Sequence, residues 1–268
     1  MIRLPTVELE VDVGATLATW QKEVDELPSY EDRVKEAARL FATRNTRTNL
    51  TFGRIRASLA NMCSGATRCA YCEDSLADEV EHFRPKQLYP EHVFVWPNYI
   101  YACGPCNGPK GGRFEVIVAG GDIVDVTRKP GQPLLPPTAG RPIVIDPRTE
   151  DPLTFLQLDL TDTFRFLPHS GLSPMDQQRA ERTIAILGLN RRDALCVARR
   201  EAMNDYLRHL EAYDRRKAEG AEPKDLDQRA DRLKRRLHPT VWEEMKRQRN
   251  RYPALAELFA RSPELLQA

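Results

Sequence analysis

The sequence has no run of apolar residues that approaches the roughly 20 needed for a membrane span. Its first residues are acidic and interrupted by Pro5, so they lack the apolar region of a signal peptide. We therefore expect a cytoplasmic protein with no membrane partner. The formal net charge is only +1, which gives no overall electrostatic argument for a polyanionic partner.

Aromatic residues are also scarce, at 7% of the chain, and no repeat of fixed period is visible. The nucleotide-binding pattern G-x-x-x-x-G-K-[ST] is missing, so the sequence shows no ATP site of its own. What remains is a globular composition of 268 residues, 41% hydrophobic and 29% charged, with 20 prolines. Such a chain can bury one substantial core or two smaller ones.

Six cysteines are present, and four of them form two Cys-x-x-C pairs separated by 30 residues. Disulfides are rare in a reducing cytosol, so metal ligation is favoured over oxidation. Each pair can bind one edge of a tetrahedral ion, which predicts a closed, structural zinc site with four thiolates. A thioredoxin-like redox motif, which would need a βαβ context, and four free thiols are the alternatives. The predicted ligands are Cys69, Cys72, Cys103 and Cys106, while Cys63 and Cys196 are expected to be buried structural thiols.

Residues suited to phosphate chemistry lie between the two pairs and directly after the second one. Glu81 and His82 are neighbours on an expected extended segment, so one side chain can face a metal while the other faces a substrate. The oxygens of Glu81 and Asn107 suit Mg²⁺, and a neutral histidine can take a proton from water near pH 7. Each residue also has an ordinary structural explanation, but together they describe phosphodiester hydrolysis. Nearby cations suited to phosphate are Arg84, Lys86, Lys110 and Arg113.

In their order and spacing these residues resemble the HNH, or His-Me finger, nucleases, through the segments VEHFRPK, WPNYIYAC and CGPCNGPK. The resemblance implies a ββα-metal core in which His82 is the general base. It further implies that Glu81 and Asn107 hold one catalytic Mg²⁺ or Mn²⁺, and that Asn98 braces the loop between the two strands. Glu81 stands where Asp is commoner in that family, and Asn107 where His is commoner. Both departures retain the oxygen ligand that the pattern needs.

Further segments resemble the PtuB proteins, which are HNH nucleases of Septu and of certain retron anti-phage systems. These segments are EHFRPK, the W-x-N before the second cysteine pair, IDP at 145–147 and TIAILGLN at 183–190. The resemblance implies a nucleic-acid substrate, DNA in preference to RNA, and a PtuA-like ATPase as partner protein. Residues 1–50 and 215–268 show no such resemblance.

The predicted fold class is α+β, with a ββα-metal core and a four-cysteine zinc site between two helical regions. The expected parts are a helical region (1–62), a nuclease core (63–128), a Pro-rich connector with short strands (129–170) and a second helical region (171–268). Ser29, Ser173 and Asn190 are the expected helix N-caps. The expected strands are two short ones at 80–83 and 92–96, a hairpin at 115–127 and a pair within 154–167.

A second class of function fits the cysteines equally well: a non-catalytic, zinc-stabilised adaptor that binds nucleic acid or protein. The set of Glu81, His82, Asn98 and Asn107 distinguishes the two, because a binding module does not need it. From residue 176 to 251 there are 20 Lys and Arg against 14 Asp and Glu. This excess fits either a surface facing nucleic acid or an ordinary charged helical surface, and at this size the ordinary surface is favoured.

Overall fold

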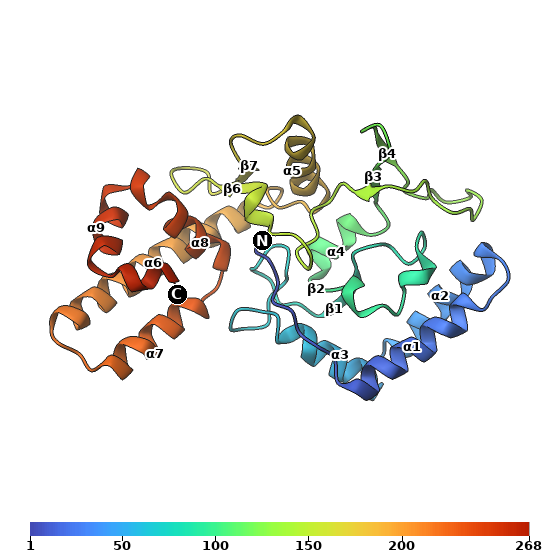
Figure 1. Cartoon of the computed structure of the whole chain (residues 1–268), viewed down its shortest axis with the longest axis horizontal. Helices are drawn as coiled ribbons and strands as arrows, with labels where there is room; N and C mark the ends of the chain where they lie inside the picture. The colour runs from blue at the N-terminus through green and yellow to red at the C-terminus, as the bar shows by residue number, and fades with distance from the viewer. Residues whose placement is uncertain (268) are drawn as a thin grey trace.

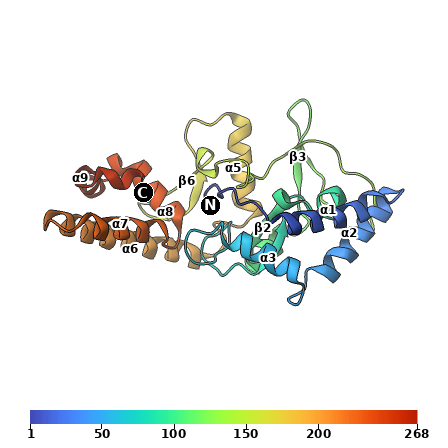
Figure 2. The same ribbon diagram turned by 60° about the horizontal axis from the view of Figure 1, so that its bottom comes forward.

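The computed structural model describes residues 1–267, and its elements are arranged along one long axis. Figures 1 and 2 show the first three helices at one end, the last four at the other end, and a small strand and helix unit between them. Helices and short strands therefore coexist in one chain, as the sequence predicts. Among residues 1–267, no helix combines the length and the apolar character that crossing a membrane requires.

Two of the three N-terminal helices begin directly after a residue whose side chain caps them. The Ser29 hydroxyl accepts a hydrogen bond from the backbone N–H of Asp32, and the Asn49 side chain accepts one from Phe52. The apolar faces of these helices pack together and against one face of the central strands. The helices are α1 (Val11–Asp25), α2 (Tyr30–Arg44) and α3 (Leu50–Ala60).

The central unit is a pair of antiparallel strands followed by a short helix. Strand β1 (Glu79–His82) pairs with β2 (Tyr99–Ala102), in a register that sets Glu79 opposite Ala102 and His82 opposite Tyr99. Helix α4 (Gly104–Lys110) follows β2 after the single residue Cys103. The order of elements is thus ββα, and the first cysteine pair directly precedes it.

The prediction of a strand at residues 92–96 was wrong. That segment lies between two single 3₁₀ turns, Pro90–His92 and Trp96–Asn98, and the second strand starts only at Tyr99. Val93 and Phe94 are both buried against the N-terminal helices. The backbone N–H groups of Val93 and Val95 donate to the carbonyls of Pro90 and His92, so the segment is held by local turns and not by the ladder of a strand.

Two further small sheets lie beyond the central unit, and both predicted strand pairs are confirmed. Strand β3 pairs with β4 as a hairpin, and β3 also pairs with β5 on its other edge. Strand β6 pairs with β7. Residues 143–145 of the Pro-rich stretch are fully buried in the main core, so this part is not a surface loop. The strands are β3 (Glu115–Ile117), β4 (Ile123–Asp125), β5 (Arg141–Pro142), β6 (Leu156–Leu158) and β7 (Phe166–Pro168).

The C-terminal helices share one core with the cysteine loops and the small sheets. Ser173 caps its helix as predicted, accepting from the N–H of Asp176. The predicted cap at Asn190 was wrong: its amide instead bonds both backbone groups of Phe166 in β7, and Arg192 precedes the next helix. The helices are α5 (Pro174–Ile186), α6 (Asp193–Ala218), α7 (Pro223–Lys234), α8 (Pro239–Gln248) and α9 (Pro253–Arg261).

Candidate functional site

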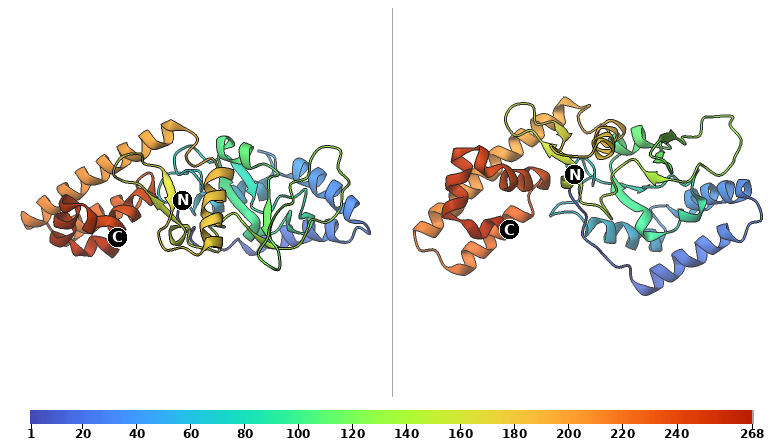
Figure 3. Two further views of the ribbon diagram at one scale, coloured as in Figure 1. Left: turned by 90° about the horizontal axis from the view of Figure 1, so that it is seen from above. Right: turned by 45° about the horizontal axis from the view of Figure 1, so that its top comes forward.

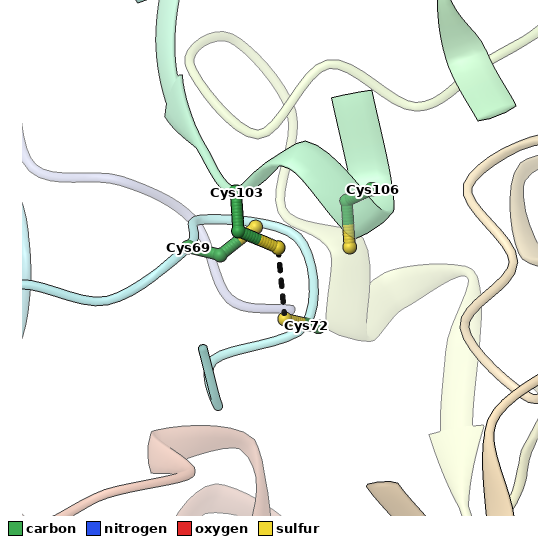
Figure 4. A group of neighbouring side chains, drawn as sticks. All are labelled: Cys69, Cys72, Cys103 and Cys106. Atoms are coloured by element: carbon green, nitrogen blue, oxygen red, sulfur yellow. Dashed lines mark hydrogen bonds between the residues drawn. The ribbon is translucent and has the colours of Figure 1, made fainter. Parts of the chain in front are cut away.

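The four paired cysteines converge although 30 residues separate the pairs. Their sulfur atoms all lie within 4.8 Å of one another, and the Sγ atoms of Cys72 and Cys103 are 3.8 Å apart. Figure 4 shows the side chains turned toward a common centre, from the first cysteine loop and from the start of α4. Tetrahedral zinc with Zn–S bonds near 2.3 Å sets its sulfurs about 3.8 Å apart, so the cluster fits that ion. Each of the four cysteines is buried, at 2% exposure or less.

The cluster is supported by a cation from the C-terminal part of the chain. Arg192, just before α6, directs one guanidinium nitrogen to the sulfur of Cys106 at 3.4 Å and another to the Ser75 hydroxyl at 3.5 Å. Hydrogen bonds to Cys103 and Cys106 hold the pKa of the Cys72 thiol well below its usual range. Four thiolates around one dication carry a net charge of −2, so a neighbouring guanidinium lowers the electrostatic cost of the cluster.

Strand β1 presents two carboxylates to α4. Alternation along a strand places Glu79 and Glu81 on one face and His82 on the other. Glu81 is 3% exposed; one of its oxygens forms an ion pair with the Lys110 ammonium, and the other accepts from the Tyr71 hydroxyl at 2.7 Å. Glu79 accepts a 2.7 Å hydrogen bond from the side-chain amide of Asn107.

The imidazole of His82 is held in an aromatic environment. Its ring centroid lies 4.4 Å from that of Phe41 and 5.3 Å from that of Tyr99. Its Nε2 is 2.9 Å from the carbonyl of Val93, an arrangement that assigns the proton to Nε2 and leaves the lone pair on Nδ1. Burial first, and the neighbouring charge of Lys86 second, lower the pKa of His82 to about 3. The ring is therefore neutral near pH 7, the form that can accept a proton.

Asn98 links the segment after β1 to the loop before β2. Its side-chain oxygen accepts from the backbone N–H of Arg84 at 2.7 Å. Its amide nitrogen donates to the carbonyls of Arg84 at 3.1 Å and His92 at 2.9 Å. Because His92 is next to Val93, these bonds also fix the carbonyl that binds the His82 ring. The geometry is that of a brace, and its value for catalysis stays a prediction.

A polar cavity of about 320 Å³ brings several of these residues together beside α4. Oxygen donors on one wall and a histidine on another are what a hard divalent cation and a proton transfer require. The lining includes Glu79, Glu81, His82, Lys86 and Asn107, with glycines of the α4 region.

The four predicted cations are not all placed at this cavity. Lys86 lines it, with its ammonium 5.0 Å from the Phe41 ring centroid. Lys110 is fully buried, and its ammonium also bonds the carbonyl of His82 at 3.0 Å, so a phosphate contact would require it to leave these partners. Arg84 lines a different cavity, and Arg113 is exposed outside the lining.

Glu79 was missed by sequence reasoning, although a signal was available. It lies two residues before Glu81, and a strand that starts at residue 79 places both carboxylates on the same face. A Cβ added at Gly104 would lie 3.1 Å from a carboxylate oxygen of Glu79, so the first residue of α4 is small where this side chain approaches. The two unpaired cysteines also differ from expectation, since Cys63 and Cys196 are only partly buried.

Comparison with known proteins supports one of the resemblances seen in the sequence. Over 83 residues the chain is 36% identical to the Septu protein PtuB of Bacillus thuringiensis. The match covers 29% of this chain and 32% of that protein, so the chain spans about a third of the length of the curated relative. No family model matches the chain. The expected resemblance to PtuB is confirmed at this level, and the HNH character stays a prediction.

Proposed function

We propose that this protein is a metal-dependent endonuclease of the HNH type, which hydrolyses phosphodiester bonds in nucleic acid, DNA in preference to RNA. The observation that carries the proposal is the cavity beside α4. In one ββα unit it combines two carboxylates, an amide and a neutral histidine, next to four clustered thiols. An adaptor that only binds has no use for this combination.

The donor set of the cavity fits a hard divalent cation. The groups that would hold Mg²⁺ or Mn²⁺ are the carboxylate of Glu81 and the side-chain oxygen of Asn107. A carboxylate has about four lone-pair positions, and Lys110 and Tyr71 take up only part of those on Glu81. When bound, such an ion supplies Lewis-acid stabilisation of the charge that develops on the phosphate and on the leaving oxygen.

The protein groups then have separate tasks. Nδ1 of His82 accepts a proton from the attacking water, whose oxygen forms the new bond to phosphorus as the bond to the 3′-oxygen breaks. The Val93 carbonyl holds the opposite side of the ring, and Asn98 holds the backbone that carries this carbonyl. Glu79 accepts from the Asn107 nitrogen and so leaves the amide oxygen for the cation. Lys86 places a positive charge near the phosphate.

The test is a nicking assay on supercoiled plasmid, circular single-stranded DNA and RNA, with Mg²⁺ or Mn²⁺. We expect His82→Ala to lower the cleavage rate by about 10²–10⁴, the usual contribution of a general base. His169→Ala is the matched control, because His169 is only half-buried and lies outside the cavity. Wild-type protein that leaves all three substrates intact, alone and with its partner ATPase, would favour the adaptor.

We also propose that the nuclease acts in anti-phage defence with a PtuA-like ATPase. The support is the partial match to a Septu protein, together with the lack of a P-loop in this chain. Co-expression with a PtuA-like ATPase should protect cells from phage, and His82→Ala should abolish the protection. Equal protection by wild type and His82→Ala would separate defence from nuclease activity.

A further inference from the structure

A groove of about 740 Å³ lies between the first cysteine loop and the paired helices α6 and α7. It is separate from the cavity beside α4, since the two share no lining residue. Figure 3 shows α6 and α7 running side by side away from the central unit. The charged lining residues of the groove are Asp74, Glu201, Asp205, Arg208, Arg232, Arg235 and Arg236.

The charges around this groove do not balance. Arg236 forms an ion pair with Asp205, and the carboxylate of Asp74 is 3.4 Å from Nε2 of the buried His238. Burial lowers the pKa of His238, so its neutral ring does not offset the charge of Asp74. Asp74 and Glu201 are therefore the carboxylates that remain in the lining. Against these two stand three exposed arginines, none of which forms an ion pair with any residue from 1 to 267. They are Arg208, Arg232 and Arg235.

The wall of the groove is held in place by tight backbone packing. Gly65, just before the first cysteine pair, has a φ of +84°, and a Cβ built there would lie 2.1 Å from the carbonyl oxygen of Arg235. Only glycine fits this contact, which fixes the loop against the end of α7. The arginines are thus presented on a fixed frame that is tied to the cysteine cluster.

We propose that this groove binds the phosphate backbone of the nucleic acid at a distance from the cleavage cavity. Guanidinium groups pair with phosphate oxygens through two parallel hydrogen bonds, and three unpaired ones along a concave surface suit a chain of phosphates. The inference rests on the proposed nuclease function for the identity of the anion. The groove gives the protein a second hold on its substrate, through contacts that carry no base sequence.

The groove suits nucleic acid better than an acidic protein. Protein interfaces are anchored by Trp and Tyr as well as Arg, and Lys, Glu and Asp are depleted from them. Among residues 1–267, the lining contains no Phe, Tyr or Trp, and its apolar part consists of three alanines and Leu237. The same lack of aromatic side chains argues against base stacking and leaves the phosphates as the natural contact.

The test measures binding alone, in a His82→Ala background that prevents cleavage. The groove variant replaces Arg208, Arg232 and Arg235 by Ala. The control variant replaces Arg47, Arg215 and Arg251 by Ala, which removes the same charge from exposed arginines outside the groove. Fluorescence anisotropy with labelled duplex, single-stranded DNA and RNA oligonucleotides gives Kd as a function of salt. Circular dichroism checks that both variants fold.

We expect the groove variant to weaken binding by at least tenfold at low salt, and the control by less than threefold. The slope of log Kd against log salt should fall by about 2.7 for duplex, or about 2 for a single strand, if each arginine contacts one phosphate. Equal losses in both variants would reduce the effect to net charge and overturn the site. Unchanged oligonucleotide binding in the groove variant would overturn it too, and would assign the groove to an acidic protein.

These outcomes are independent of the catalytic proposal. A wild-type protein that never cleaves but binds through the groove would leave this inference intact and remove the nuclease function. If the wild type cleaves but the groove variant binds oligonucleotides with unchanged affinity, the nuclease function stands and the groove site is removed.

Discussion

The cysteine cluster and the polar cavity lie on the same ββα unit, yet the structure presents them very differently. At the cluster, four sulfurs already lie at zinc-binding distances. At the cavity, the oxygen donors are engaged with protein partners: Glu81 with Lys110 and Tyr71, and Glu79 with Asn107. A site with closed coordination can be built by the fold alone, whereas a catalytic site has to keep exchangeable positions. In our proposal the first site supplies rigidity and the second supplies reactivity.

The largest expected effect comes from removing one thiolate ligand of the four-cysteine cluster. We expect Cys103→Ser to lose the zinc and to unfold the central unit, because metal binding and folding are coupled in such sites. Elemental analysis should find one zinc per chain in the wild type after dialysis and less than 0.1 in the variant, roughly the tenfold loss expected for a broken site. Circular dichroism and thermal melting report the fold. Cys63→Ser is the control, since Cys63 lies outside the cluster. A stable wild-type protein without metal would contradict the zinc assignment.

The next effect compares the free energy of unfolding that is lost when a buried ion pair or an exposed ion pair is broken. Lys110→Met leaves the Glu81 carboxylate buried without its cation, which should lower the free energy of unfolding by about 3–5 kcal/mol. Urea denaturation measures the loss. Lys35→Met is the control, because the Lys35–Glu31 pair is exposed on α2 and should contribute little. A loss for Lys110→Met as small as that of the control would show that the pair is solvated.

A smaller effect is expected on the metal affinity of the cavity beside α4. If Glu79 orients the Asn107 amide, Glu79→Gln should weaken Mn²⁺ binding by about 10–100-fold, the usual effect of changing a residue that orients a ligand. The double variant Glu79→Gln with Asn107→Asp keeps the net charge and allows the new glutamine to donate to the new carboxylate. It should recover affinity to within about threefold of wild type, less than 1 kcal/mol.

Mn²⁺ electron paramagnetic resonance measures this binding without any need for turnover. Equal affinity of wild type and Glu79→Gln would remove the orienting role while leaving the cation site in place. Loss of affinity in both the single and the double variant would show that Glu79 acts through its charge.

The smallest effect concerns the cation beside the cluster. Arg192→Gln removes a charge but keeps a hydrogen-bond donor near Cys106, so the zinc should stay bound under ordinary conditions. Release of zinc to a colorimetric chelator should become about 10-fold faster, within the range for changes around metal ligands. Arg191→Gln is the control, because within residues 1–267 the Arg191 side chain, one residue earlier, forms no hydrogen bond to the cluster sulfurs. Equal release rates would show that Arg192 does not support the thiolates.

The difference between the two sites also explains what the sequence could reveal. Each cysteine has one ligand atom on a short side chain, so the spacing of Cys69 to Cys72 and of Cys103 to Cys106 nearly determines the geometry. A carboxylate or amide can turn toward any of several partners. Whether Asn107 faces Glu79 or Glu81, and whether Lys110 is buried or solvated, depends on tertiary packing that no local pattern encodes.

The same distinction holds for the fold. Helix starts at Ser29 and Ser173 follow from local capping chemistry, and the hairpin at 115–127 follows from paired β-branched runs around two glycines. The errors fell where tertiary contacts prevail over propensity. Residues 92–96 are rich in β-branched and aromatic side chains, but Val93 and Phe94 fill the core under the N-terminal helices. Asn190 bonds to β7 in preference to capping α6.

The central claim is that one chain contains a closed zinc site and an open, exchangeable cation site that serves hydrolysis. The most direct measurement follows zinc content and plasmid cleavage together, in protein stripped of loosely bound ions by EDTA dialysis and then titrated with Mg²⁺. The expected result is one retained zinc per chain at every point, no cleavage at the start, and cleavage that rises with Mg²⁺ to a plateau. Cleavage without added Mg²⁺, or activity that rises and falls with the zinc content alone, would contradict the division between the two sites.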